Sequence, residues 1–181
     1  MDVDDFWGLI EAARVEAADP SDPELVTEKA VTLLALRPPH EIIRAAQTLW
    51  DVMADSYRPE LWGAAYQVNG GCSDDGFEYF RGWLLTQGRA AYEAAVADPD
   101  SLADLPALRA AVAAERDDIE CESALGIADD AYLVATGEQL PADAFAIRYQ
   151  PPTFDWDFDD HAEARRRLPR LMELLHTERG W

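Results

Sequence analysis

Residues 61–85 read LWGAAYQVNGGCSDDGFEYFRGWLL, and this stretch sets the helical period of the chain. Its apolar residues first recur at helical spacing and then meet Asn69-Gly70-Gly71, a typical left-handed end of a helix. Ser73 and the two acids after it are typical of the start of a second helix. The second half places apolar residues at i, i+3 and i+7, namely Phe77, Phe80 and Leu84. Two helices joined by a tight glycine turn are therefore predicted.

The residues before this stretch show the same period, interrupted by prolines. Because the residue before a proline is pushed out of the helical region, these breaks separate three predicted helices. The apolar stripes of the three are Phe6, Leu9, Ile10 and Ala13, then Val26, Ala30, Leu33 and Leu34, then Ile42, Ala46, Leu49 and Met53. We expect Asp2 to cap the first helix, and Ser21 with Glu24 to form a capping box on the second.

One further helix is predicted between the helix that begins at Ser73 and residue 137. Asp98-Pro99 ends the helix that begins at Ser73, and Gly88 could interrupt it. A long helix is expected from about Leu105, and Gly126 could kink it. Its apolar side would consist of Cys121, Leu125, Ala128 and Tyr132.

Residues 137–158 break the helical pattern with three prolines and several aromatic residues that lack helical spacing. Because linkers seldom contain so many aromatic residues, we expect an extended strap packed over the helices. Asp159 is the predicted cap of a C-terminal helix over residues 159–177, which Pro169 either kinks or divides. The whole pattern predicts an all-α fold, a single-domain irregular bundle of about six to eight helices over residues 1–181.

Acids alternate with aromatic residues at the end of the strap, in residues 155–160. Four arginines follow directly: Arg165, Arg166, Arg167 and Arg170. We expect the aromatic residues to be buried and the acids to pair with the adjacent helix. An arm that binds a partner protein is the alternative.

The composition excludes several classes of protein. Of the 181 residues, 49% are hydrophobic and 10% aromatic, as in a globular domain. The net charge of −21 opposes binding to nucleic acid or to an anionic membrane surface. No run of about 18 apolar residues is present, so no transmembrane helix is expected. The acidic start Met1-Asp2-Val3-Asp4-Asp5 is the opposite of a basic signal peptide, and we expect a cytoplasmic protein.

The cysteines and histidines give no sign of a metal centre. Cys72 and Cys121 are expected to be reduced thiols in a chain without an export signal. The histidines, His40, His161 and His176, lack the spacing of a zinc site. No cofactor motif is present either, and we expect no cofactor.

The chain resembles an uncharacterised bacterial family, the domain of unknown function 4240. The resemblance rests on residues 61–85 and on three other features of the sequence. These are the opening Met1-Asp2 with Phe6-Trp7, the later Asp98-Pro99-Asp100-Ser101-Leu102, and Glu120-Cys121-Glu122 ahead of Ala131-Tyr132. The similarity covers roughly the first three quarters of the chain. It implies a small, mostly helical bacterial domain and transfers no activity.

The glycine turn is the first candidate site, formed by Gly70, Gly71, Ser73, Asp74, Asp75, Glu78 and Arg81. Free amides at a helix start can hold an anion, but here Asp74 and Asp75 occupy that end and the lysine of a phosphate loop is missing. A tight turn with a charged cap is the simplest interpretation. The alternative is a divalent-cation site of Asp74, Asp75 and Glu78.

An acidic face is the second candidate. On the predicted long helix it would consist of Glu115, Asp118, Glu120 and Glu122. Residues 98–130 contain ten acids against two arginines, which favours a solvated face or a docking surface for a basic protein.

An aromatic cluster is the third candidate, formed by Trp62, Tyr66, Phe80 and Trp83. Such residues at helical spacing belong to the core more often than to a ligand pocket.

Three hypotheses for function follow. The first is a non-enzymatic cytosolic protein, accessory, regulatory or antitoxin-like, whose acidic surface docks on a basic protein. The second is a divalent-metal-dependent hydrolase or transferase that uses Asp74 and Asp75. The third is a binder of a small ligand in the aromatic cluster.

Overall fold

The computed structural model describes residues 1–150 and 152–179. Along these residues the chain forms ten α-helices and two short 3₁₀ helices and no strand. The predicted all-α fold is confirmed, with more helices than the expected six to eight, because predicted long helices are divided. No helix in this described part is long and apolar enough to cross a membrane.

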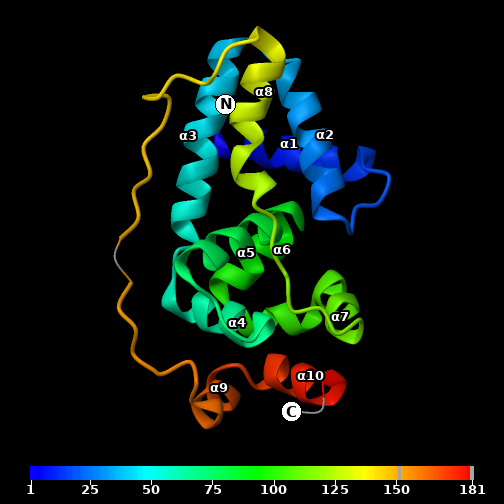
Figure 1. The fold of residues 1–181 in the computed structure, drawn as a ribbon, viewed down its shortest axis with the longest axis vertical. Helices are drawn as coiled ribbons and strands as arrows, with labels where there is room; N and C mark the ends of the chain where they lie inside the picture. Colours follow the sequence, from blue (N-terminus) through cyan, green and yellow to red (C-terminus); the bar gives the residue numbers. More distant parts are fainter. Residues whose placement is uncertain (151, 180–181) are drawn as a thin grey trace.

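Four helices form one end of the molecule (Figure 1). They are α1 (Val3–Glu16), α2 (Pro23–Ala35), α3 (Pro39–Asp55) and α8 (Ile127–Thr136). Helix α2 packs against α1 and α8, and α8 also packs against α3. Helix α8 therefore returns the chain to the helices formed by its N-terminal part.

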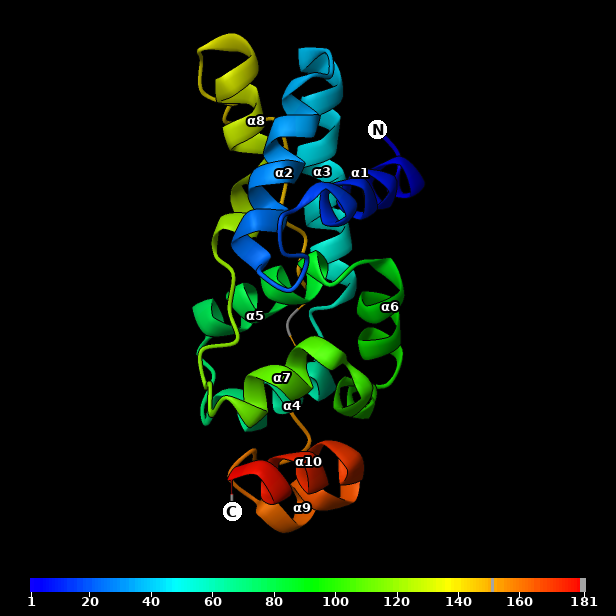
Figure 2. The ribbon, with the colours of Figure 1, turned by 90° about the vertical axis from the view of Figure 1, so that its right-hand side faces the viewer.

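The middle of the molecule consists of shorter helices, seen from the side in Figure 2. They are α4 (Pro59–Asn69), α5 (Asp74–Thr86), α6 (Arg89–Ala97), η1 (Pro99–Asp104) and α7 (Pro106–Ala113). A short helix, η2 (Ser123–Gly126), packs on α5 and leads into α8. One continuous hydrophobic core joins residues from α1 through to the last helix.

The C-terminal helices lie at the opposite end from α8 (Figure 1). They are α9 (His161–Arg167) and α10 (Pro169–Arg179), and α10 packs on η1 and α7. The described residues of the strap, 137–150 and 152–158, run along one side of the molecule without regular structure between α8 and α9. The predicted extended strap is confirmed.

The glycine turn between α4 and α5 forms as predicted. Gly70 and Gly71 have φ angles of 66° and 140°, in the region that favours glycine. The Ser73 hydroxyl accepts a hydrogen bond from the Gly76 amide at 3.1 Å and so caps α5. Phe77, Phe80 and Leu84 of the predicted stripe are fully buried.

The caps of the first two helices differ in how well they were predicted. Asp2 and Asp5 form a reciprocal capping box on α1, which confirms Asp2 as its cap. The predicted capping box of Ser21 with Glu24 is wrong. Asp22 caps α2 by accepting from the amides of Glu24 and Leu25, while Ser21 donates to Asp19. An aspartate directly before the helix leaves no amide for the more distant serine.

The predicted long helix from Leu105 past Tyr132 is wrong. Helix α7 ends at Ala113, Glu115 has a φ of 55°, and residues 116–122 are not helical. The buried stripe of α7 consists of Leu108 and Val112, and the next positions at helical spacing, Glu115 and Arg116, are charged, so the apolar stripe is not continued. The chain turns instead against α5, where the Cys121 amide donates to the Tyr79 carbonyl at 2.9 Å. Gly126 accordingly lies at the junction of η2 and α8 and kinks no helix.

The C-terminal helix predicted over residues 159–177 is divided at Pro169, which starts α10. Its predicted cap was wrong by one residue, because Asp160 accepts from the amides of Ala162 and Glu163. Gly88 likewise divides the helix that begins after Ser73, with a φ of 89° between α5 and α6.

Candidate functional site

An acidic groove lies where α2, α3, α5, η2 and α8 meet. It is an open cavity of about 740 Å³. The residues that line it are Glu24, Trp50, Glu78, Tyr79, Glu122, Ser123, Leu125, Gly126 and Asp130. Four of the nine carry a carboxylate and none carries a positive charge.

Behind the groove, the backbone of the segment before η2 packs closely against α5. A Cβ atom on Gly82 of α5 would lie only 2.3 Å from the carbonyl oxygen of Cys121. Glycine therefore lets the segment before η2 approach α5 closely enough for the Cys121–Tyr79 backbone hydrogen bond. This approach brings Glu122 beside Glu78 and Tyr79 of α5.

Most of the groove's carboxylates have no cation beside them. Glu24 accepts hydrogen bonds from the Ser123 hydroxyl at 2.7 Å and from the Cys121 thiol at 3.5 Å. Glu78 lies 3.8 Å from Arg81. In the described part of the chain, Glu24, Glu122 and Asp130 form no ion pair with lysine or arginine.

The acids around Tyr79 shift its pKa. The Glu122 carboxylate, with burial and Asp75 adding to its effect, raises the pKa of Tyr79 above its ordinary value. The Tyr79 hydroxyl donates a hydrogen bond to this carboxylate.

A family model described as "Protein of unknown function (DUF4240)" matches residues 1–133. The chain belongs to this family. The matched residues, called the DUF4240 module below, include every residue that lines the groove. No curated protein and no solved structure matches the chain. The resemblance inferred from the sequence is thereby confirmed, and it transfers no activity.

The predicted turn site of the DUF4240 module does not come together as a metal centre. Asp74 and Asp75 are exposed in the first turn of α5, where they complement the helix dipole. Glu120 approaches the same helix end, with its Oε1 atom 3.4 Å from the position of a Cβ on Gly76. Within the described residues, no group of three or more His, Cys, Asp or Glu side chains could hold a metal ion.

The predicted acidic face does not lie on a helix, because the chain is extended there. Glu115 follows the end of α7, and Asp118 pairs with Arg116 at 2.9 Å. Burial, with Asp118 adding to its effect, raises the pKa of Glu120. Of the four predicted residues, Glu122 alone lines the groove.

The predicted aromatic cluster is divided into two groups. Phe80 and Trp83 contact each other in the core, with ring centroids 5.5 Å apart. Trp62 instead stacks on Phe77 at 4.7 Å and donates to the Cys72 carbonyl at 3.0 Å. Tyr66 lies at the edge of α4 and donates to Asp159 at 2.6 Å.

Cys72 and Arg81, from the predicted turn region, have surroundings that indicate a role in the fold instead of in catalysis. Burial raises the pKa of the Cys72 thiol to about 12, so this cysteine is a poor nucleophile. Arg81 is fully buried and donates to the Met53 carbonyl at 2.6 Å. Its guanidinium lies 4.8–5.0 Å from the ring centroids of Tyr57, Phe77 and Tyr149.

Sequence reasoning missed most of the groove. Glu24 and Asp130 are more than 100 positions apart in the chain, and only the packing of α8 on α2 brings them together. Trp50 lies on α3 beside the predicted stripe, where its spacing gave no sign of a site. Glu24 and Asp130 lie in the first turns of α2 and α8, but acids at helix starts are common in this chain and gave no signal of a shared site.

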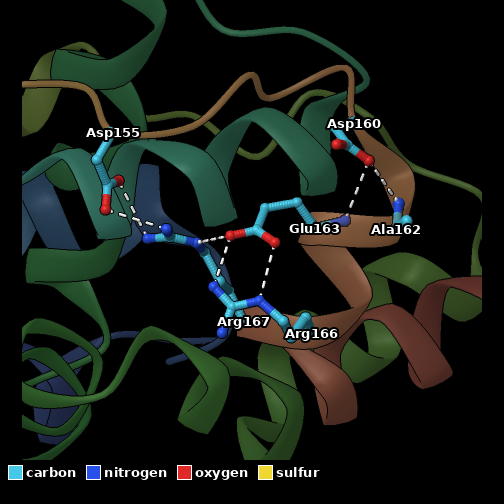
Figure 3. Close-up of polar contacts among 6 residues, drawn as sticks. All are labelled: Asp155, Asp160, Ala162, Glu163, Arg166 and Arg167. Atoms are coloured by element: carbon cyan, nitrogen blue, oxygen red, sulfur yellow. Dashed lines mark hydrogen bonds and ion pairs between the residues drawn. The ribbon is translucent and has the colours of Figure 1, made fainter.

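Two acids at the C-terminal end, Asp155 and Glu163, are paired with arginines, as Figure 3 shows. Arg167 donates to both carboxylate oxygens of Asp155 at 3.0 Å and to Glu163 at 2.7 Å. Its guanidinium also lies 5.5 Å from the Trp156 ring centroid. Arg166 donates to Glu163 as well. The expected pairing of the strap's acids with the following arginines is thus found for Asp155.

Proposed function

We propose that this chain is a non-enzymatic accessory or regulatory protein of the cytoplasm that docks a basic segment of another protein in the acidic groove. The observation that supports this proposal best is the lining of the groove, with four carboxylates and no cation. An antitoxin-like role is one form of the same activity, because an acidic protein can cover a basic surface of its target.

The charge distribution favours a basic partner. Three groove carboxylates lack an ion-pair partner within the described chain, so an incoming lysine or arginine would not have to displace an internal cation. Such a cation would gain attraction from several carboxylates at once, and the net charge of −21 would speed its approach. Trp50 and Tyr79 add aromatic surface to the same groove.

Binding of a synthetic nine-residue arginine peptide to the full chain tests the proposal, measured by isothermal titration calorimetry. We expect binding that weakens steeply with added NaCl, and no binding of a nine-residue glutamate peptide. The variant Glu24→Gln/Glu122→Gln/Asp130→Asn should weaken binding at least about tenfold, equivalent to roughly 1.4 kcal/mol.

A matched variant separates the groove from the overall charge. Glu16→Gln/Glu60→Gln/Glu138→Gln removes the same number of charges from exposed positions outside the groove. It should change the affinity less than about twofold, because screening leaves distant charges with little effect. Equal weakening by both variants would mean that the peptide senses only net charge, and would contradict docking in the groove.

A further inference from the structure

The strap lies on the DUF4240 module in the manner of a bound peptide. Among the described residues, the module contacts the strap's backbone through two glutamine side chains. The Gln47 amide both donates to the Ala146 carbonyl, at 3.2 Å, and accepts from the Ala146 amide, at 2.8 Å. The Gln67 amide donates to the Phe158 carbonyl at 2.6 Å. Contacts of this kind hold a backbone in place whatever its side chains are.

Aromatic side chains of the strap contact aromatic residues of the module between these two glutamines. Each contact joins one ring of the strap to one ring of α3, α4 or the loop between them. The pairs, with centroid distances, are Phe145 on Trp50 at 5.5 Å, Tyr149 on Tyr57 at 4.3 Å, Phe154 on Trp62 at 5.3 Å and Phe158 on Tyr66 at 5.6 Å.

A glycine completes the surface on which the strap lies. A Cβ atom on Gly63 would lie 2.4 Å from the Trp156 ring, so α4 has room for this indole because residue 63 has no side chain. The module therefore presents a line of aromatic contacts and one glycine notch to an extended segment.

The surface beneath the strap is also polar, unlike a permanent core. Gln67 and Arg81 are 2% and 0% exposed, and each makes a hydrogen bond to the strap. Arg81 donates to the Tyr149 hydroxyl at 3.2 Å. If the strap left, each side chain would lose one hydrogen bond, which water could replace, and this lowers the cost of exposing the face.

The strap fits this face incompletely. Phe154 is 48% exposed although its ring contacts Trp62. The Trp156 indole nitrogen is buried and has no hydrogen-bond partner among the described residues. Leaving such a donor unsatisfied weakens the attachment of the strap.

We infer that this face of α3, α4 and α5, called the strap-binding face below, docks an extended, aromatic-rich peptide segment of another protein, and that the strap occupies it as an intramolecular competitor. The residues of the strap-binding face, from Gln47 to Arg81, lie inside the matched DUF4240 module, whereas the strap lies beyond residue 133. A tethered segment acts at an effective concentration of order millimolar, so it suppresses weaker peptides until it is displaced.

Fluorescence anisotropy of a labelled peptide with the sequence of residues 143–160 tests this inference on the full chain. The variant Tyr149→Ala/Phe154→Ala removes two anchors of the tethered strap but leaves the strap-binding face of the module unchanged. We expect the peptide to bind this variant at least about tenfold more tightly than the wild-type chain, because the internal competitor is weakened. The control Ile147→Ala/Thr153→Ala changes exposed strap residues that make no ring contact, and should behave as wild type.

The same experiment contains the result that would overturn the inference. Equal affinity of the peptide for the wild-type chain and the anchor variant, or binding to neither at millimolar concentration, contradicts peptide docking on the strap-binding face. A peptide with all its aromatic residues replaced by alanine should bind neither chain, and binding that matches the parent peptide would equally contradict it.

A second measurement uses the wild-type chain, in case the anchor variant fails to fold. Arg148 is exposed and is the one trypsin site of the strap. Adding the peptide, carrying Arg148→Gln so that it is not cut at this position, should displace the strap and accelerate cleavage after Arg148 several-fold. Cleavage at Arg148 that is unchanged at millimolar peptide would contradict the inference.

Discussion

The C-terminal end of the molecule and the acidic groove use their acids in opposite ways. At the C-terminal end, an arginine neutralises each of several acids, and the pairs join segments that are distant in the chain. Arg170 contacts Asp98, Asp100 and Asp104 of η1 and its cap, and Arg167 contacts Asp155 of the strap. In the acidic groove, only Glu78 lies near an arginine among the described residues. Several acids at the C-terminal end are therefore paired with arginines, whereas three of the four groove acids form no such pair within the described residues.

The two regions also depend on different forces. The C-terminal end is attached by the apolar side chains that it adds to the core, such as Leu171 and Leu175, and by charge-assisted hydrogen bonds, of which the contacts of Asp100 are the most buried. The groove is shaped by backbone packing of the Cys121 segment against α5, and its carboxylates repel one another. Substitutions that remove a charge should therefore damage the first region and leave the second intact.

Asp100→Ala should have the largest effect. Its buried carboxylate accepts hydrogen bonds from the Leu171 amide at 2.9 Å, the Arg170 amide at 3.2 Å and the Arg170 side chain at 3.1 Å. Because this carboxylate both caps α10 and compensates a cation, we expect a loss of about 3 kcal/mol in the free energy of unfolding, measured with urea. Asp104→Ala removes an exposed acid beside the same arginine and should cost much less. An equal cost for both variants would show that burial does not distinguish them.

Gly82→Ala should have the next largest effect, and it tests the other region. The added methyl group would clash with the Cys121 carbonyl oxygen, so the segment that carries Glu122 has to move. We expect a loss of about 2 kcal/mol in stability together with weaker binding of the arginine peptide. Gly8→Ala in α1 is the control. No atom lies within 4 Å of a Cβ there, and alanine favours the helix by up to about 1 kcal/mol.

The sequence predicted the helices of the N-terminal half and the strap, because these depend on local signals. Apolar spacing, prolines and the Asn69-Gly70-Gly71 turn act over a few residues, and the structure follows them. The long helix after Leu105 was mispredicted because the residues after Ala113 find their partners on α5 instead of within a helix. The groove was missed for the same reason, since Glu24, Glu78 and Asp130 meet only after α8 has packed on α2.

The pH dependence of individual carboxylates sharpens the comparison. Hydrogen bonds from Arg166 and Arg167 lower the pKa of Glu163 from 4.5 to about 2. A lowered pKa in the folded state contributes stability above the unfolded value, and this contribution is lost as the pH falls from about 4.5 to 2. Near the groove, burial raises the pKa of Glu120, so its ionised form opposes folding at neutral pH and protonation relieves this as the pH falls. A carbon-13 NMR titration should show Glu120 titrating above 4.5 and Glu163 far below it. Similar pKa values for the two would show that the surroundings of Glu120 and Glu163 do not differ in this way.

Glu122→Gln should have the smallest effect on stability, and this near-absence of an effect is itself informative. Its side chain is exposed, forms no ion pair in the described chain and lies beside other acids, so the neutral amide removes repulsion and can keep a hydrogen bond to Tyr79. We expect the free energy of unfolding to change by less than about 0.5 kcal/mol in urea. Asp100→Asn is the same chemical change in the paired region and should be clearly destabilising. If Glu122→Gln destabilised the fold as much, Glu122 would have a structural partner, and its carboxylate would already be engaged within the fold instead of binding a basic ligand.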